Sequence, residues 1–422
     1  MGRLQVMIAR KYMEKLWSKN FTIITLGTVV SALGNAISAF SIALIVLGYT
    51  QSTFLFAVFQ VVYNLPKIVM PLIVGPYMDR FSRSRVIYSL DFLSSALYLF
   101  VFVLLFNDLF IYGVFLFLAF IIGCIDGTYQ VAYDSLYPTL VSEKNYSKAY
   151  SISSIIYPLS SVTVLVAAFL YDHYGAQGLA PLFLFNTVCF FIAAAFETQI
   201  RAPETYIPVD APKFSLAGYR REFVDGLRYI NGERGLKVIT AYFFLCMLAF
   251  AASGVVVLPY FMAHENLRTT WYTYVMAGGV IGRLIGGGVL YNFKYSAKIR
   301  FALSVGVYIA LSFLEGTYLF FPALVMIGMQ VVSGILSVTS FNIRTAATQS
   351  YVPNEFRGRF NGTFQMICTL GTILGQLLAG AMADFFSGRI VLAAFMGVNL
   401  VAVLMIMVPW RRDVSMIYNR DV

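Results

Sequence analysis

Three ionisable residues, Lys67, Asp126 and Arg283, lie deep inside long apolar stretches of this chain. A charged side chain in an apolar medium is costly, so such residues usually face the protein interior and often serve function. An aspartate there can gain or lose a proton as its surroundings change, and an arginine can bind an anionic group. These residue types therefore offer proton exchange and charge recognition inside an apolar environment.

Helices that cross a lipid bilayer are the elements that must position these residues. Of the 422 residues, 59% are hydrophobic and only 12% are charged, which is about half the charged fraction of a soluble domain. The runs are about twice as long as barrel strands, which favours helices over a β-barrel. A spanning helix needs about 20 apolar residues, and we identify twelve runs, at 21–47, 54–78, 86–106, 111–133, 151–171, 182–196, 238–262, 270–291, 301–313, 319–341, 362–383 and 390–410.

The basic residues indicate the topology of these helices. All but four of the 30 lysines and arginines fall on one side, in the terminal segments and alternate loops, and the exceptions are Lys67, Arg268, Arg283 and Arg389. Cytoplasmic loops are enriched in basic residues. We therefore expect a multi-pass protein of the cytoplasmic membrane with both termini inside, and we interpret the net charge of +10 as a topology signal and not as a sign of nucleic-acid binding.

The chain divides into two similar halves. Related features recur at an offset of about 212 residues, such as Gly75-x-x-x-Asp79 and Gly288-x-x-x-Asn292, and duplicated halves are a known transporter architecture. We predict an all-α membrane protein with twelve transmembrane helices in two pseudo-symmetric six-helix bundles. The bundles comprise residues 1–197 and 238–422, and the cytoplasmic linker at 198–237 carries an amphipathic helix.

A polar run, Gly75-Pro-Tyr-Met-Asp79-Arg80-Phe-Ser82-Arg83, follows the second apolar stretch. In a chain of two six-helix halves, this run resembles the Gly-x-x-x-Asp-Arg/Lys-x-Gly-Arg-Arg/Lys motif of the major facilitator superfamily, with serine in place of the second glycine. The segments 138–143 and 349–359 resemble those of bacterial macrolide-efflux-type exporters. The glycine-rich motif of helix five and the helix-four arginine of drug–proton antiporters are missing.

The resemblance implies that this run forms a conformational latch together with Asp134. By family analogy, Asp79 accepts hydrogen bonds from the N-terminus of helix eleven, and Arg83 balances Asp79 and Asp134, at the inner end of helix four. Gly75 permits close helix approach, and Arg80 belongs to the same motif. In the alternative interpretation, these charges only anchor helices at the membrane surface.

The resemblance also places the buried charges. Helices two and four are neighbours in this fold, so Lys67 and Asp126 can form an ion pair, with Asp126 as the candidate proton carrier; alternatively, the pair is fixed and only holds the helices together. Arg283 either binds an anionic substrate group or caps helix ends. Helices one, four, seven and ten line the central path of this fold. The candidate substrate-path residues on these helices are polar or polarisable: Asn35, Tyr129, Gln130, Met329 and Gln330. Each of them can instead be a packing residue.

Four other ionisable residues are expected to have structural or solvent-exposed roles and no part in transport. Asp91 is expected to have a structural hydrogen-bonding role, and Glu315, His173 and His264 are expected to be solvated near the outer ends of helices. The four cysteines have no CxxC spacing, so we expect packing residues and no metal or other cofactor.

These features favour a transporter over an enzyme, because the chain has no GxSxG, HExxH or Walker A pattern. We expect a secondary active transporter that moves a small amphipathic molecule by alternating access, through proton-coupled efflux. The alternatives are an uptake symporter and a carrier of a lipid-like metabolite. The expected partners are the small-molecule substrate, protons and the lipid bilayer, without nucleic acid, and the expected state is a monomer.

Overall fold

A computed structural model describes residues 16–78, 81–141, 149, 152, 163–201, 216–264, 266–292 and 296–420. Ten helices in this part of the chain are long and apolar enough to cross a membrane. The predicted all-α membrane fold is therefore confirmed, whereas the count of twelve spans remains a prediction. The predicted span at 151–171 lies largely outside the described residues, and the one at 270–291 forms a helix that is rich in glycine, threonine and tyrosine.

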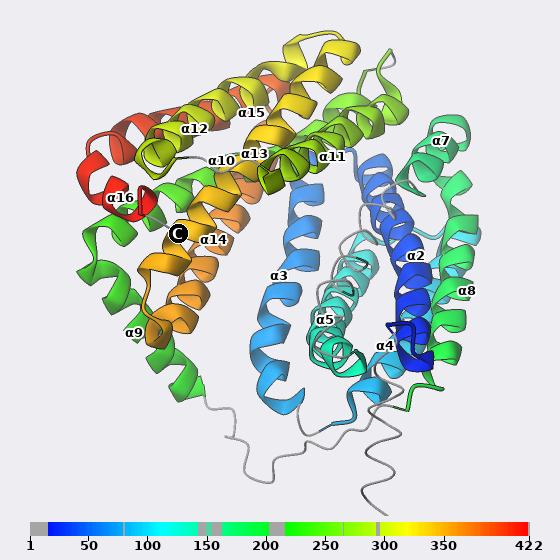
Figure 1. The fold of residues 1–422 in the computed structure, drawn as a ribbon. Coiled ribbons are helices and arrows are strands. Elements are labelled where there is room, and N and C mark those ends of the chain that lie inside the picture. Colours follow the sequence, from blue (N-terminus) through cyan, green and yellow to red (C-terminus); the bar gives the residue numbers. More distant parts are fainter. Residues whose placement is uncertain are drawn as a thin grey trace, which may run out of the picture. The chain divides into compact units, whose positions relative to one another are not determined.

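The chain divides into two compact units (Figure 1). Unit 1 comprises Met1–Gln51 and Val62–Phe214, and unit 2 comprises Ser52–Val61 and Ser215–Val422. Helix α3 belongs to both, since its first turns cluster with unit 2 and its remainder with unit 1.

Unit 1 is a bundle in which α8 packs against both α2 and α4, and α4 also packs against α5. A fully buried asparagine, Asn186 of α8, donates a hydrogen bond of 2.7 Å to the Ser38 hydroxyl of α2. Such a polar contact fixes the register of two otherwise apolar helices. The helices of this unit are α2 (Lys19–Thr50), α3 (Thr53–Met78), α4 (Arg83–Phe106), α5 (Tyr112–Leu136), α7 (Val164–Tyr174) and α8 (Ala180–Glu197).

Unit 2 is built on two tight helix pairs, α11 with α13 and α10 with α14. Three glycines of α11, Gly278, Gly282 and Gly286, form a small-x-x-x-small ridge that lies directly against α13. An added Cβ at Gly282 would stand only 2.0 Å from a backbone oxygen of that helix. The helices of this unit are α9 (Leu216–Gly232), α10 (Arg234–Met262), α11 (Arg268–Asn292), α12 (Arg300–Thr317), α13 (Ala323–Tyr351), α14 (Asn354–Ala383), α15 (Gly388–Ala402) and α16 (Arg411–Tyr418).

The predicted amphipathic helix of the linker is α9, which packs on α14 and α10. Its Tyr229 ring stacks on Phe356 at 4.7 Å, and Ile230 is buried, while Leu227 remains exposed. The apolar face of α9 therefore has a protein partner within unit 2.

The first turn of α3 is held by an aspartate at the end of α14. The Asp384 carboxylate accepts the backbone N–H groups of Thr53 at 3.0 Å and Phe54 at 3.3 Å, and the Ser52 hydroxyl at 3.1 Å. A carboxylate in this place satisfies helix N–H groups that have no partner inside the helix. This cap attaches the start of α3 to unit 2.

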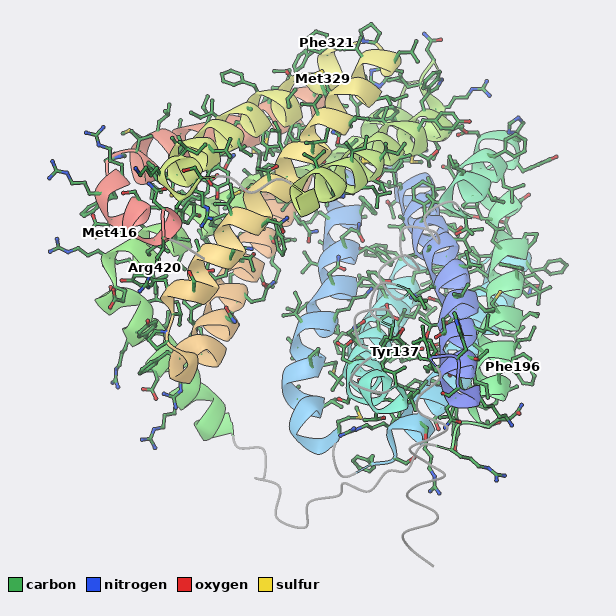
Figure 2. All side chains as sticks on the ribbon, viewed as in Figure 1. Tyr137, Phe196, Phe321, Met329, Met416 and Arg420 are labelled. Carbon is green, nitrogen blue, oxygen red and sulfur yellow. The ribbon has the colours of Figure 1, made fainter. Side chains whose placement is uncertain are left out.

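Large apolar side chains cover much of the outer surface (Figure 2). Phe196 of α8 is 54% exposed, whereas Tyr137, which follows α5, is 1% exposed in the core of unit 1. Extended apolar surface of this kind is unusual in a soluble monomer and is what a helix bundle presents to lipid. The exposed side chains therefore agree with the multi-pass membrane fold.

Candidate functional site

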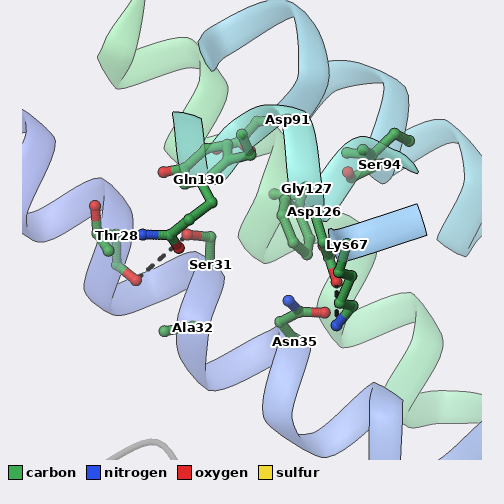
Figure 3. Close-up of a pocket in the computed structure, with 13 residues that line it drawn as sticks. Thr28, Ser31, Ala32, Asn35, Lys67, Asp91, Ser94, Asp126, Gly127 and Gln130 are labelled. Carbon is green, nitrogen blue, oxygen red and sulfur yellow. Dashed lines mark hydrogen bonds and ion pairs between the residues drawn. The ribbon is translucent and has the colours of Figure 1, made fainter. Parts of the chain in front are cut away.

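Unit 1 contains a cavity of about 320 Å³, a volume within the range of small-molecule pockets. Helices α2, α3, α4, α5 and α8 all contribute to its wall (Figure 3). Its ionisable and other polar lining residues are Thr28, Ser31, Asn35, Lys67, Asp91, Ser94, Asp126, Tyr129 and Gln130. The structure thus brings five sequence-predicted site residues into one cavity: Lys67, Asp126, Asn35, Tyr129 and Gln130.

An ion pair joins α3 and α5 in the wall of this cavity. The Lys67 Nζ lies 2.8 Å from Oδ2 of Asp126, and their side chains are 31% and 20% exposed. The same Oδ2 accepts a hydrogen bond of 3.2 Å from the Tyr63 hydroxyl, and the Lys67 ammonium lies 3.8 Å from the centre of the Tyr63 ring. Because Tyr63 precedes Lys67 by one helical turn, both side chains reach the same carboxylate.

Two glycines of α5 make this meeting possible. An added Cβ at Gly123 would stand 2.3 Å from the Tyr63 carbonyl oxygen, and one at Gly127 would stand 3.0 Å from the Lys67 Cα. Gly123 and Gly127 therefore form a small-x-x-x-small face on which α3 packs backbone to backbone. Since Asp126 directly precedes Gly127, this close approach places its carboxylate beside the lysine.

Asp91 is the other acidic residue that lines this cavity, and its expected structural hydrogen-bonding role remains a prediction. It is 1% exposed and lines the cavity, yet its Oδ2 makes no hydrogen bond within the described residues. Its electrostatic neighbours are Glu197, at the end of α8, and Asp126. Asp91 therefore belongs to a cluster of acidic groups.

The other predicted path residues belong to unit 2 and are not among the residues that line this cavity. Gln330 is buried and donates a hydrogen bond of 3.2 Å to Glu315, which also accepts one from Ser333. The expectation that Glu315 is solvated is therefore wrong, because two side chains of α13 satisfy its carboxylate inside the bundle. Arg283 is exposed, and Met329 is half-buried on α13.

The predicted latch is only partly visible, because Asp79 and Arg80 lie outside the described residues. Gly75 lies in the last turn of α3. The hydroxyl of Ser82, which stands where the family motif has glycine, accepts the Arg85 N–H at 3.4 Å and caps α4.

Within the described residues, Arg83 and Asp134 form no ion pair with each other, and their role in the latch remains a prediction. The Arg83 guanidinium instead donates to the Ser135 carbonyl at 2.9 Å, and the exposed Asp134 carboxylate accepts from the Gln130 amide at 2.9 and 3.0 Å. Gln130, one turn before Asp134 on α5, is the hydrogen-bond partner of the Asp134 carboxylate. Arg83 contacts the end of α5 through the backbone carbonyl of Ser135.

Sequence reasoning missed Tyr63 and Glu197 as members of this site. Tyr63 could have been found from its spacing of four residues to Lys67, and the site's helix contact from the glycines that flank Asp126. Glu197 gave a weaker signal, because it ends an apolar run at a position where an acidic residue normally faces water.

Comparison with known proteins identifies the family. Among curated proteins, the uncharacterized MFS-type transporter YkuC of Bacillus subtilis is 27% identical over 316 residues, covering 71% of this chain and 70% of YkuC. Macrolide efflux protein A of Streptococcus pyogenes is 24% identical over 391 residues, covering 88% of this chain and 92% of that protein.

A solved structure has the same fold. The crystal structure of the nucleoside transporter NupG aligns with a TM-score of 0.66 at 13% identity, covering 92% of this chain and 98% of NupG. The sequence profile of the Major Facilitator Superfamily matches residues 24–375. The chain therefore belongs to the Major Facilitator Superfamily of transporters.

Proposed function

We propose that this protein is a secondary active transporter that exports a small amphipathic molecule across the cytoplasmic membrane by alternating access, in exchange for protons. The observation that carries the proposal is the Lys67–Asp126 ion pair in the wall of a cavity large enough for such a molecule. The similarity to macrolide efflux protein A supports an amphipathic cargo and the outward direction.

The ion pair offers a physical route for coupling. An ionised Asp126 carboxylate holds the Lys67 ammonium at 2.8 Å and the Tyr63 hydroxyl at 3.2 Å. A proton on Asp126 removes the attraction to Lys67, because a neutral carboxyl group no longer balances the ammonium charge. A proton and a substrate that compete for this carboxylate are not bound together, so the cycle exchanges one for the other.

The proposal also includes the topology of the chain, a substrate path and a conformational latch. The protein is a monomer with both termini in the cytoplasm, and residues 1–197 and 238–422 form two bundles joined by the linker at 198–237. The substrate path comprises Asn35, Tyr129, Gln130, Arg283, Met329 and Gln330. The conformational latch comprises Gly75, Asp79, Arg80, Arg83 and Asp134, with Arg83 anchored on the Ser135 carbonyl.

Transport by purified protein in lipid vesicles tests this function. We expect a pH gradient to drive accumulation of a labelled macrolide, and Asp126→Asn to abolish the accumulation while leaving the protein folded. Asp225→Asn removes a carboxylate from α9, outside the cavity, and should transport as the wild type does. Equal gradient-driven accumulation by wild type and Asp126→Asn would refute the coupling role, and accumulation only in the opposite vesicle orientation would indicate uptake.

A further inference from the structure

Two acidic side chains that take no part in the Lys67–Asp126 ion pair lie near each other at the cavity, and one of them lines it. Asp91 of α4 is 1% exposed and Glu197 of α8 is 0% exposed, and they are direct electrostatic neighbours. The two helices that carry these residues, α4 and α8, pack against each other. Asp91 lines the cavity that also holds Asp126 (Figure 3), so one member of the pair reaches the candidate transport site.

Three carboxylate oxygens of this pair accept no hydrogen bond from a described donor group. Within the described part of the chain, Oδ2 of Asp91 and both Oε atoms of Glu197 have no hydrogen-bond partner. An ionised carboxylate can only accept hydrogen bonds, whereas a protonated one also donates. One proton between the two groups would supply the missing donor, and buried polar groups normally have partners.

Among the described residues, the groups recorded around this pair carry no positive charge. The electrostatic neighbours of Asp91 are Glu197 and Asp126, and the buried Tyr129 hydroxyl of α5 lies near both Asp91 and Glu197. The only lysine in α2 is its first residue, and on the α2 side Glu197 meets Gly27, where an added Cβ would stand 2.6 Å from Oε1. No lysine or arginine among the described residues forms an ion pair with either acid, and the nearby lysine of α3 is paired with Asp126.

Two buried carboxylates without a cation do not both ionise, because each would be desolvated and repelled by the other. We propose that Asp91 and Glu197 form a proton-binding site in which two carboxyl groups share one proton next to the cavity. The site is distinct from Asp126, whose charge is balanced by a lysine. A role for this proton in transport rests on the proposed function, whereas its presence does not.

Infrared spectroscopy of the full-length protein in lipid vesicles tests the proposal without any substrate. Near neutral pH, we expect the wild type to show the C=O band of one protonated carboxyl group that Asp91→Asn, Glu197→Gln and the double variant all lack. In each single variant, the new amide can donate to the remaining carboxylate and replace the proton. Asp126→Asn is the matched control and should retain the band.

Several results would overturn the shared proton. They are a wild type without the band near neutral pH, a band that persists in either single variant, and a band that sodium ions remove at constant pH, which would indicate a cation site instead. If a variant does not fold, isotope-labelled aspartate and glutamate in the wild type assign the band directly. Gradient-driven transport separates the two proposals, because an absent band with intact proton coupling refutes only the pair.

Discussion

The close packing of α3 on α5 predicts a graded response to alanine substitution of three glycines. At Gly123, an added Cβ would stand 2.3 Å from the Tyr63 carbonyl oxygen, where an ordinary C···O contact is about 3.3 Å. The two backbones must therefore part by about 1 Å, and overpacking of this kind costs about 1–3 kcal/mol. Alanine recovers about 0.5–1 kcal/mol of helix propensity, so we expect Gly123→Ala to destabilise the protein by up to about 2.5 kcal/mol.

The other two glycines serve as internal comparisons. At Gly127 the nearest contacts are 3.0 Å, so Gly127→Ala should cost less, and at Gly113 of the same helix nothing lies within 4 Å, so Gly113→Ala should be neutral or stabilising. Thermal unfolding in detergent can be followed with a fluorogenic thiol dye, because Cys189, Cys246 and Cys368 are buried in the folded protein. Equal stability of Gly123→Ala and Gly113→Ala would refute the close packing that positions the ion pair.

Substitutions at three further positions test the fold by the same thermal assay. Ser38→Ala leaves the buried amide of Asn186 without its 2.7 Å acceptor and should cost about 1–3 kcal/mol; an unchanged melting temperature would contradict this. Asp384→Ala removes the cap on α3 and should cost about 1 kcal/mol, with Asp384→Asn closer to wild type. Burial and the hydrogen bond to Glu233 raise the pKa of Tyr351 to about 12, so this bond stabilises the protein fully below about pH 10 and is lost as pH rises through 12. The stability difference between wild type and Tyr351→Phe, about 1 kcal/mol, should hold steady near neutral pH and shrink in strong alkali.

The helical membrane fold could be predicted because the length and apolar character of each run can be read directly from the sequence. A run of apolar residues long enough to cross a bilayer is visible without knowledge of its neighbours. The spacing of Gly278, Gly282 and Gly286 can also be read in the sequence, and these glycines pack on α13. The packing partner of α9 was not visible, since an amphipathic pattern shows an apolar face without showing whether lipid or protein covers it.

The site could be predicted where its residues are charged and the neighbouring residues in the sequence are apolar. Lys67 and Asp126 stood out because charges are rare in apolar runs, and they meet at 2.8 Å. Glu197 and Glu315 did not stand out, since each lies near the end of its helix, where water normally solvates a carboxylate. Their burial depends on which side chains neighbouring helices present, and a single sequence does not contain that information.

Asn186 and Asn399 show what the internal repeat could have added. They are separated by nearly the same offset that relates the two halves, and each donates to a serine on a neighbouring helix, Ser38 and Ser312 respectively. The two serines lie on helices that do not correspond in the repeat, because Ser38 lies on α2, the first described helix of unit 1, and Ser312 lies on α12, which is not the first helix of unit 2. The repeat therefore identifies the buried amides but not their partners.

Proton movement through Asp126 is the most direct test of the account. A pH-sensitive dye trapped in vesicles would report protons displaced when a macrolide, or the amphipathic compound that most stabilises the purified protein, is added. We predict a proton signal for the wild type and for Asp225→Asn, and none for Asp126→Asn at equal substrate binding. A signal of wild-type size from Asp126→Asn would contradict the central claim that this carboxylate exchanges a proton for substrate.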